Sequence, residues 1–182
     1  MSEAVKKGIE STGATADIFQ VPETLTEEIL GKMGAPPKPD YPIITPEKML
    51  EYDGYMFGLS GRFGTFPSQM KAFFDSLGGH WQKGALVGKA AGTFTSVATL
   101  GGGQETVNLS CIPFITHMGM VFVPMGYIEP KVFTLEEVHG ASPYGCGTFA
   151  AGDGSRQPSD LEKEIAESHG KHFAGIAGKL AK

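Results

Sequence analysis

The hydrophobic residues of this chain fall into two patterns that alternate along it. Four short apolar runs have the length and composition of buried β-strands, and they cover residues 17–21, 55–59, 92–99 and 120–124. In the segments between them, apolar residues recur every three or four positions, as on one face of a helix; these segments begin near residues 2, 26, 46, 68, 104 and 159. Strands that alternate with helices predict an α/β fold with an open parallel sheet and helices on both faces.

Several residues mark where these segments start, stop or give way to irregular structure. Thr26 and Ser159 have the side chains preferred at helix N-caps, and each precedes a segment of helical period. The proline-rich stretch 34–42 predicts a surface loop, and Pro113 predicts a kink or an early end in its helix. Residues 126–158 are rich in glycine and lack a clear period, so they predict a long loop of the kind that is often functional or interfacial.

Length and charge narrow the class of protein. The chain has 182 residues, 41% hydrophobic and 19% charged, which predicts one globular domain over residues 1–182. Its formal net charge is −5 and it has no basic cluster, so we expect neither nucleic-acid binding nor attraction to an anionic membrane surface. Its apolar runs are shorter than the roughly 18 residues of a membrane span, so we expect no integral membrane contact.

The two cysteines suggest a reduced compartment and no metal site. Cys111 and Cys146 have neither the spacing of metal ligands nor a partner motif. We interpret both as reduced packing residues, which favours a cytoplasmic location.

One strand ends in a loop that could bind a ligand. The strand expected at residues 92–99 runs into the glycines 101–103 and then into Gln104 and Glu105, which suit the start of a helix. In an open α/β sheet this order can present backbone N–H groups to a ligand. An ordinary β-to-α turn has the same order, with glycine present only because it permits positive φ. A single glycine run leaves both interpretations open.

Six segments together resemble a known family along the whole chain. They read VPET at 21–24, GLSGRFG at 58–64, GGHWQKGALVGK at 78–89, GGGQE at 101–105, HMGMVFVPMGY at 117–127 and GDGSRQPS at 152–159. In order and spacing they resemble the WrbA-type NAD(P)H:quinone oxidoreductases, which are flavodoxin-like FMN proteins. The resemblance implies a five-stranded flavodoxin-like sheet with FMN at the strand C-terminal ends. It also implies NAD(P)H as co-substrate, two-electron reduction of a quinone, and self-association as a homodimer or homotetramer.

The resemblance also assigns roles to residues. It implies that two loops lie beside the flavin ring, formed by Gly61, Arg62 and Phe63 and by Ser96, Val97, Ala98, Thr99, Leu100 and Gly101. It further implies three catalytic residues, with Trp81 and Tyr127 lining the quinone and nicotinamide pocket and His117 at the reacting edge of the ring. Backbone N–H groups and an imidazole there would stabilise the charge that develops on reduced flavin.

Each of these residues also has a purely structural interpretation. His117 could interact with terminal carbonyls at a helix end, Trp81 could pack in a core or an interface, and Arg62 could form a surface ion pair. The stretch 152–156 invites interpretation as a phosphate site, but we expect it to shape the start of the last helix and a subunit contact.

The chain departs from the family pattern at its beginning and at the flavin loops. Met1 lies within the family's first helix, so the first, central strand and the FMN-phosphate loop are absent, which predicts a shortened N-terminus or a rearranged sheet. Val97 lacks the family's hydroxyl, and Ala98 and Leu100 stand where smaller or more flexible residues are expected. We therefore expect weak or absent FMN binding by this chain. Two functions follow: an FMN-dependent quinone oxidoreductase, or a cofactor-deficient flavodoxin-like scaffold that binds a partner.

Overall fold

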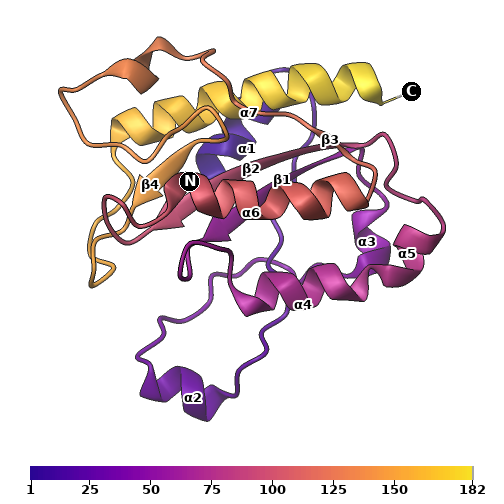
Figure 1. Cartoon of the computed structure of the whole chain (residues 1–182), viewed down its shortest axis with the longest axis horizontal. Helices are drawn as coiled ribbons and strands as arrows, with labels where there is room; N and C mark the ends of the chain where they lie inside the picture. The colour runs from indigo at the N-terminus through magenta and orange to yellow at the C-terminus, as the bar shows by residue number, and fades with distance from the viewer. Residues whose placement is uncertain (182) are drawn as a thin grey trace.

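The computed structural model describes residues 1–181 and has three layers, with helices on both sides of a β-sheet (Figure 1). In chain order the elements are α1 (Ser2–Glu10), α2 (Glu27–Lys32), α3 (Pro46–Met49), β1 (Gly54–Ser60), α4 (Ser68–Ser76), α5 (Gly78–Gln82), β2 (Ala90–Val97), α6 (Gln104–His117), β3 (Val121–Phe122), η1 (Pro130–Phe133), β4 (Gly147–Phe149) and α7 (Asp160–Leu180). The predicted α/β class with a parallel sheet is confirmed.

Strand β2 is the centre of the sheet, because every other strand pairs with it. Strand β1 runs parallel to it over its full length, from Gly54 opposite Ala90 to Ser60 opposite Ser96. Both β3 and β4 are also parallel to β2 and occupy successive stretches of its other edge, β3 at residues 90–91 and β4 at residues 95–97. The carboxyl ends of β1, β2 and β4 therefore meet at one end of the sheet.

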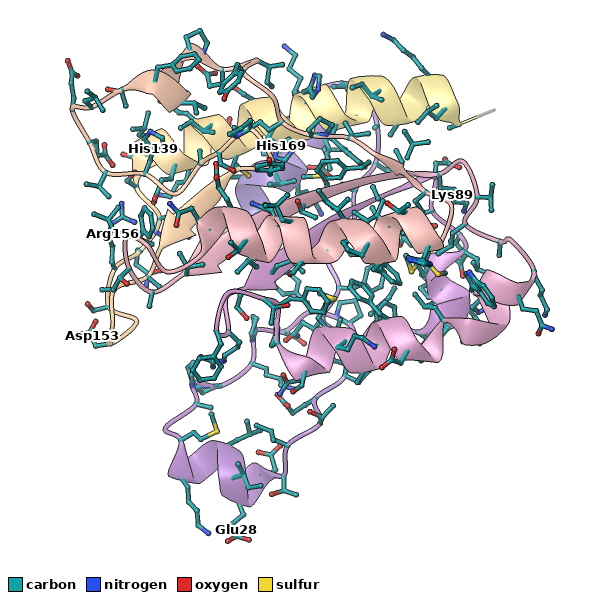
Figure 2. The ribbon with its side chains drawn as sticks, in the orientation of Figure 1. Glu28, Lys89, His139, Asp153, Arg156 and His169 are labelled. Atoms are coloured by element: carbon teal, nitrogen blue, oxygen red, sulfur yellow. The ribbon has the colours of Figure 1, made fainter. Side chains whose placement is uncertain are left out.

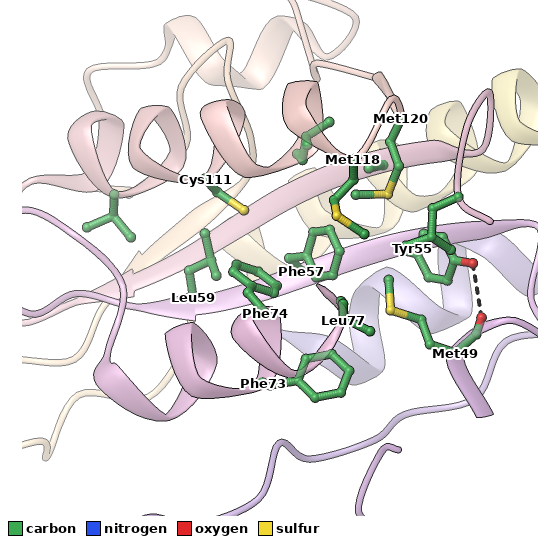
Figure 3. Packing of buried hydrophobic residues seen from close by; sticks show 14 of the residues in the cluster. Met49, Tyr55, Phe57, Leu59, Phe73, Phe74, Leu77, Cys111, Met118 and Met120 are labelled. Atoms are coloured by element: carbon green, nitrogen blue, oxygen red, sulfur yellow. Dashed lines mark hydrogen bonds between the residues drawn. The ribbon is translucent and has the colours of Figure 1, made fainter. Parts of the chain in front are cut away.

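Side-chain alternation along β1 and β2 divides the core between the two faces. Aromatic and aliphatic side chains on one face pack against α4 and α6, and the close-up in Figure 3 shows Phe57 of β1 together with Phe74 of α4 and Cys111 of α6. Phe74 stacks on Phe114 of α6 with ring centroids 3.6 Å apart. The opposite face packs against α1 and α7 and includes the buried Phe94. Because β2 is covered on both faces, seven of its eight residues are buried, as expected for an interior parallel strand.

Helices α1 and α7 cross at close range because each has a glycine at the contact. A Cβ atom added to Gly8 would lie 2.0 Å from the Glu167 carbonyl oxygen, and one added to Gly170 would lie 2.1 Å from the Val5 carbonyl oxygen. No larger residue fits at either position without movement of a backbone.

The set of strands differs from the one predicted from the sequence. Residues 17–21 were expected to form a strand, but they contribute only an isolated bridge between Gln20 and Ile43. Within residues 1–181 no neighbouring strand reaches them, and without a partner an apolar run cannot form a ladder. Strand β4 was missed because it is three residues long and lies in the stretch 126–158 predicted as a loop. The sheet described here thus has four strands, not five.

The structure also refines two points about the helices. Helix α6 continues through Pro113 to His117, so of the two alternatives at Pro113 the early end is excluded. Helix α5 has no counterpart among the helical segments predicted from the sequence, and it makes Trp81 helical. The N-cap predictions are confirmed: the Thr26 hydroxyl accepts a hydrogen bond from the backbone N–H of Ile29, and Ser159 forms a reciprocal capping box with Glu162.

Within residues 1–181, no helix combines the length and the apolar character that a membrane span requires.

The buried imidazole of His169 makes stability depend on pH. His169 lies on α7 with no exposed surface, and its Nδ1 accepts a hydrogen bond from the Cys146 backbone N–H at 3.3 Å. Burial, and to a lesser extent the nearby charge of His172, lowers the pKa of His169 from 6.5 to about 3. The unfolded chain takes up this proton below pH 6.5, whereas the folded chain does not until about pH 3.

We therefore expect the free energy of unfolding to fall as the pH drops from 6.5 towards 3, with this one group contributing up to about 1.4 kcal/mol per pH unit. Urea unfolding at a series of pH values measures this slope. The His169→Asn variant can still accept the Cys146 N–H bond and should show a shallower slope over that window. An unchanged slope would assign the acid sensitivity to other groups.

Candidate functional site

Two loops lie side by side where β1 and β2 end. The Gly61 N–H donates to the Ser96 carbonyl at 2.8 Å, which joins the start of the first loop to the end of β2. A Cβ atom added to Gly103 in the second loop would lie 3.2 Å from the Gly64 Cα in the first. The residues predicted to bind the cofactor, 61–63 and 96–101, therefore lie together at the carboxyl end of the sheet. Open parallel sheets bind their ligands at this end.

The first loop has a strained turn that presents an aromatic side chain to solvent. Arg62 and Thr65 exchange backbone hydrogen bonds of 2.7 and 3.1 Å, which close the turn. Between them Phe63 has a φ of 51°, which is uncommon for a bulky residue and is often found at functional sites. The Phe63 side chain is fully exposed. An exposed aromatic ring held by a rigid turn could form one wall for a flat ligand.

In the second loop, one side chain is buried in the core and another is exposed to solvent. The Val97 side chain is buried and lies against Gly61, where an added Cβ would be 2.7 Å from Val97 Cγ1. Leu100 is 67% exposed, and Gly101 has a φ of 71° that favours glycine. The backbone conformation of this loop is therefore compatible with its sequence, and Leu100 points away from the core.

A polar cavity of about 380 Å³ opens beside these loops, below the N-terminus of α1. Its wall includes residues from the ends of three strands and from the stretch that leads into α7, namely Ser60, Thr95, Ser96, Thr148 and Arg156, together with Met1 and Ser2. The first N–H groups of α1 have no side-chain cap, so they give this end of the cavity a positive potential.

The size and the donors of the cavity suit a small anionic group. Its volume of about 380 Å³ falls within the range of small-molecule sites, roughly 300–1,000 Å³. The start of α1 and the hydroxyl-bearing residues Ser60 and Ser96 line it, and N–H and O–H donors of this kind suit a phosphate. Thr95 also lines the cavity, but its Oγ1 is buried beside Gly147 and has no hydrogen-bond partner within the described part of the chain.

Arg156 lines the cavity, and its guanidinium is paired with a buried carboxylate. Its Nη1 donates to Glu162 Oε2 at 2.9 Å and to the Phe149 carbonyl at 2.7 Å, and Glu162 has no exposed surface. In Figure 2, Arg156 and Asp153 lie at the end of the molecule where β4 finishes, and Lys89 lies at the opposite end. Because Glu162 belongs to the capping box of α7, the expected role of residues 152–156 at the start of the last helix is confirmed.

The predicted catalytic residues Trp81 and His117 lie together, but far from the loops. The Trp81 indole N–H donates to the His117 carbonyl at 3.0 Å. Helix α6 begins at the second loop and runs back for 14 residues before it reaches His117, a distance of about 21 Å. Within a single chain, therefore, these two residues do not face the cofactor loops.

Tyr127 lies in the stretch after β3. It is 63% exposed and stacks on Phe133 with ring centroids 5.3 Å apart. Its neighbours in this stretch also expose large apolar side chains, including Leu135 and Val138. Tyr127 is thus available to a ligand or to another chain, although it does not touch His117 or Trp81.

The cavity residues Thr95, Thr148 and Arg156 were not predicted as site residues. A signal for Thr95 was present, because three hydroxyl-bearing residues, Thr93, Thr95 and Ser96, interrupt an otherwise apolar buried strand. Arg156 lies in the stretch 152–156, whose interpretation as a phosphate site was not the favoured one, and Thr148 had no local signal. Both reach the cavity because β4 pairs with the end of β2, a pairing across about 50 residues of chain that periodicity does not reveal.

The sequence is similar to several quinone oxidoreductases along nearly its whole length. It is 53% identical over 181 residues to NAD(P)H quinone oxidoreductase PST3 of Candida albicans, covering 98% of this chain and 91% of that protein. It is 52% identical over 182 residues to Quinone-oxidoreductase QR2 of Triphysaria versicolor, covering 99% of this chain and 89% of that protein.

Solved structures share the fold at much lower identity. A flavodoxin, WrbA-like protein from Agrobacterium tumefaciens superposes with a TM-score of 0.64 at 20% identity, covering all of this chain and 88% of that one. A flavodoxin from the domain Archaea gives a TM-score of 0.60 at 15% identity, covering 97% of this chain and 87% of that one. The flavodoxin-like fold that the sequence predicted is therefore confirmed. Residues 1–132 match the family described as NADPH-dependent FMN reductase, and the chain belongs to that family.

Proposed function

We propose that this protein is an FMN-dependent NAD(P)H:quinone oxidoreductase that reduces quinones by two electrons. The observation that supports this most strongly is the cavity beneath α1, which adjoins two glycine-bearing loops at the carboxyl end of the sheet. Family membership and the names of the relatives point to the same chemistry. When bound, FMN supplies the hydride chemistry that links a nicotinamide to a quinone.

The chain's own residues bind and orient the reactants in this proposal. The free N–H groups of α1 would bind the phosphate, and the hydroxyl groups of Ser60 and Ser96, which line the same cavity, would donate hydrogen bonds to it. The loops at 61–65 and 96–101 flank the flavin ring, with Phe63 as an aromatic wall. The overall reaction is balanced: NAD(P)H and one proton reduce a quinone to its hydroquinone and leave NAD(P)⁺.

We further propose that the chain is of the WrbA type and forms one domain over residues 1–182. His117, Trp81 and Tyr127 would act at the flavin only in a homodimer or homotetramer, because in one chain α6 separates His117 from the cofactor loops. Size-exclusion chromatography with light scattering measures this assembly, and a monomer with full activity would contradict the three catalytic assignments.

A conservative variant of the cavity tests the cofactor site. Ser96→Ala removes a hydroxyl from a residue that lines the cavity, with little change in side-chain volume. We expect it to weaken FMN binding by about 2- to 13-fold, since one hydrogen bond contributes about 0.5–1.5 kcal/mol. Quenching of flavin fluorescence during titration of the purified chain measures the affinity. NAD(P)H-dependent reduction of a simple benzoquinone measures activity in the same preparation.

Thr93→Val is the matched control. Thr93 belongs to the same strand as Ser96 and has a fully buried hydroxyl, but it does not line the cavity. It should leave FMN affinity unchanged. Equal losses in both variants would mean that the hydroxyls matter for the fold and not for the cofactor. Failure of the unaltered chain to bind FMN at all would instead favour the cofactor-deficient scaffold.

A further inference from the structure

Arg62 carries an exposed positive charge at the carboxyl end of the sheet. It is one of two arginines in the chain, and the other, Arg156, is paired with the buried Glu162. Arg62 is exposed, and it takes part in none of the ion pairs found within residues 1–181. Its guanidinium is therefore available to an anion that comes from outside the described part of the chain.

The backbone around Arg62 is held in a fixed conformation. The Arg62 N–H donates to the Thr65 carbonyl at 2.7 Å, and the Arg62 carbonyl accepts from the Thr65 N–H at 3.1 Å. Between them, Phe63 and Gly64 have positive φ values of 51° and 81°, as in the tight two-residue turns of β-hairpins. An anion that binds Arg62 would thus have to order only the side chain, which lowers the entropy cost of binding.

The side chain of Arg62 points away from the core. At the preceding residue, a Cβ atom added to Gly61 would lie 2.7 Å from Val97 Cγ1 and 3.4 Å from Val107 Cγ2, so that position faces the core. Successive side chains of an extended segment point in opposite directions. Arg62 therefore faces solvent, next in the chain to the fully exposed Phe63.

The cavity beneath α1 does not explain this charge. Arg62 is not among the described residues that line the cavity, where the start of α1, Ser60 and Ser96 already offer donors. The proposed reaction brings a second anion to the same loops, because NAD(P)H has a pyrophosphate and NADPH a further 2′-phosphate. Since the protein has a net charge of −5, an unpaired cation at the loops would favour the approach of that anion.

We infer that Arg62 binds a phosphate of the nicotinamide dinucleotide. This inference rests on the proposed quinone reductase function and adds to it the residue that recognises the reducing substrate. The dinucleotide must reach the loops from solvent, and the guanidinium lies on that side of the first loop. A guanidinium can donate two parallel hydrogen bonds to one phosphate, which gives it an advantage over a lysine at such a position.

Dinucleotide binding to the purified chain tests the inference, both with and without added FMN. Isothermal titration calorimetry measures the Kd of NADP⁺ and of NAD⁺ for the unaltered chain, Arg62→Gln and Arg62→Lys. We expect Arg62→Gln to raise the Kd about tenfold, near the lower end of the effect of a hydrogen bond to a charged group, because Arg62 is exposed to water. Arg62→Lys retains the charge but not the planar fork, so its Kd should lie between the other two.

The two dinucleotides identify the phosphate, and a second cation provides the control. A loss of affinity for NADP⁺ alone would assign Arg62 to the 2′-phosphate, whereas equal losses would assign it to the pyrophosphate that both dinucleotides contain. Lys171 of α7 is also exposed and also outside the ion pairs found within residues 1–181. Lys171→Gln removes the same charge and should leave both Kd values unchanged.

Unchanged dinucleotide affinities in Arg62→Gln would overturn the inference, as would equal losses in Arg62→Gln and Lys171→Gln. Absence of dinucleotide binding by the unaltered chain, with FMN and without it, would do the same. Quenching of flavin fluorescence measures FMN affinity separately, and a loss of FMN affinity in Arg62→Gln would assign the residue to the flavin instead. A chain that binds dinucleotide through Arg62 but does not bind FMN would support the inference while contradicting the proposed quinone chemistry.

Discussion

Replacing Gly170 by alanine is expected to lower the free energy of unfolding by about 1–3 kcal/mol or more, the usual range for an overpacked interior. The added methyl group would lie 2.1 Å from the Val5 carbonyl oxygen and 3.2 Å from the Ile9 nitrogen. Both atoms belong to the backbone of α1, so no side-chain rotation relieves the clash. Helix α1 must move away from α7, and the buried Val5 and Ile165 between them would lose contact.

The same helix provides the matched control. Gly175 also lies within α7, but an alanine Cβ at that position meets nothing within 4 Å. Gly175→Ala should raise stability by about 0.5–1 kcal/mol, because alanine has a better helix propensity than glycine. Urea unfolding followed by circular dichroism measures both variants. If both variants change the free energy of unfolding in the same direction, the close crossing of α1 and α7 does not depend on Gly170.

Replacing Glu162 by leucine is expected to destabilise the protein by about 3 kcal/mol, since removing one partner leaves a buried charge uncompensated. The fully buried carboxylate accepts hydrogen bonds from Arg156, from the Thr148 hydroxyl at 2.7 Å and from the Ser159 N–H at 3.0 Å. It also accepts from the Gly140 N–H at 3.2 Å. One side chain thereby connects β4, the long preceding stretch and the start of α7.

An exposed glutamate on the same helix provides the control. It distinguishes the loss of this hydrogen-bond network from the general effect of removing a negative charge. Glu164 pairs with Lys131 while remaining 56% exposed, and such surface pairs contribute about 0–1 kcal/mol. Thus Glu164→Leu should change the free energy of unfolding far less than Glu162→Leu. The double variant Arg156→Met/Glu162→Leu should recover part of the loss, because no unpaired charge is left behind. Equal losses for Glu162→Leu and Glu164→Leu would contradict the network.

Much of the fold follows from local sequence. The apolar runs that became β1 and β2, the periodic segments that became α4, α6 and α7, and the caps at Thr26 and Ser159 all lie where the pattern predicted them. The reason is that burial on one or two faces imposes a period on the sequence itself. The glycine loop at residues 101–103 was found in the same way, because it directly follows a strand, whereas the cofactor role of both loops came from the resemblance.

The errors occurred where a strand depends on a partner. Residues 17–21 have a strand-like composition, but a groove of about 930 Å³ lies between them and β1, and they form one bridge only. Residues 147–149 have almost no strand pattern, yet they form β4 because the exposed edge of β2 beyond β3 accepts them. Pairing across a sheet is decided by the edges available in space, which local composition does not record.

For the site, the sequence by itself determined that two glycine-bearing loops follow neighbouring parallel strands and must therefore meet at one end of the sheet. Only the tertiary structure decided what else meets them. It brought Thr95, Thr148 and Arg156 to a cavity below α1, and it held Trp81 and His117 at the far end of α6. The physical reason is that the direction of the chain within a βα unit is determined by residues close together in the sequence. The packing of distant segments depends instead on which surfaces of the folded elements are still exposed and can be buried.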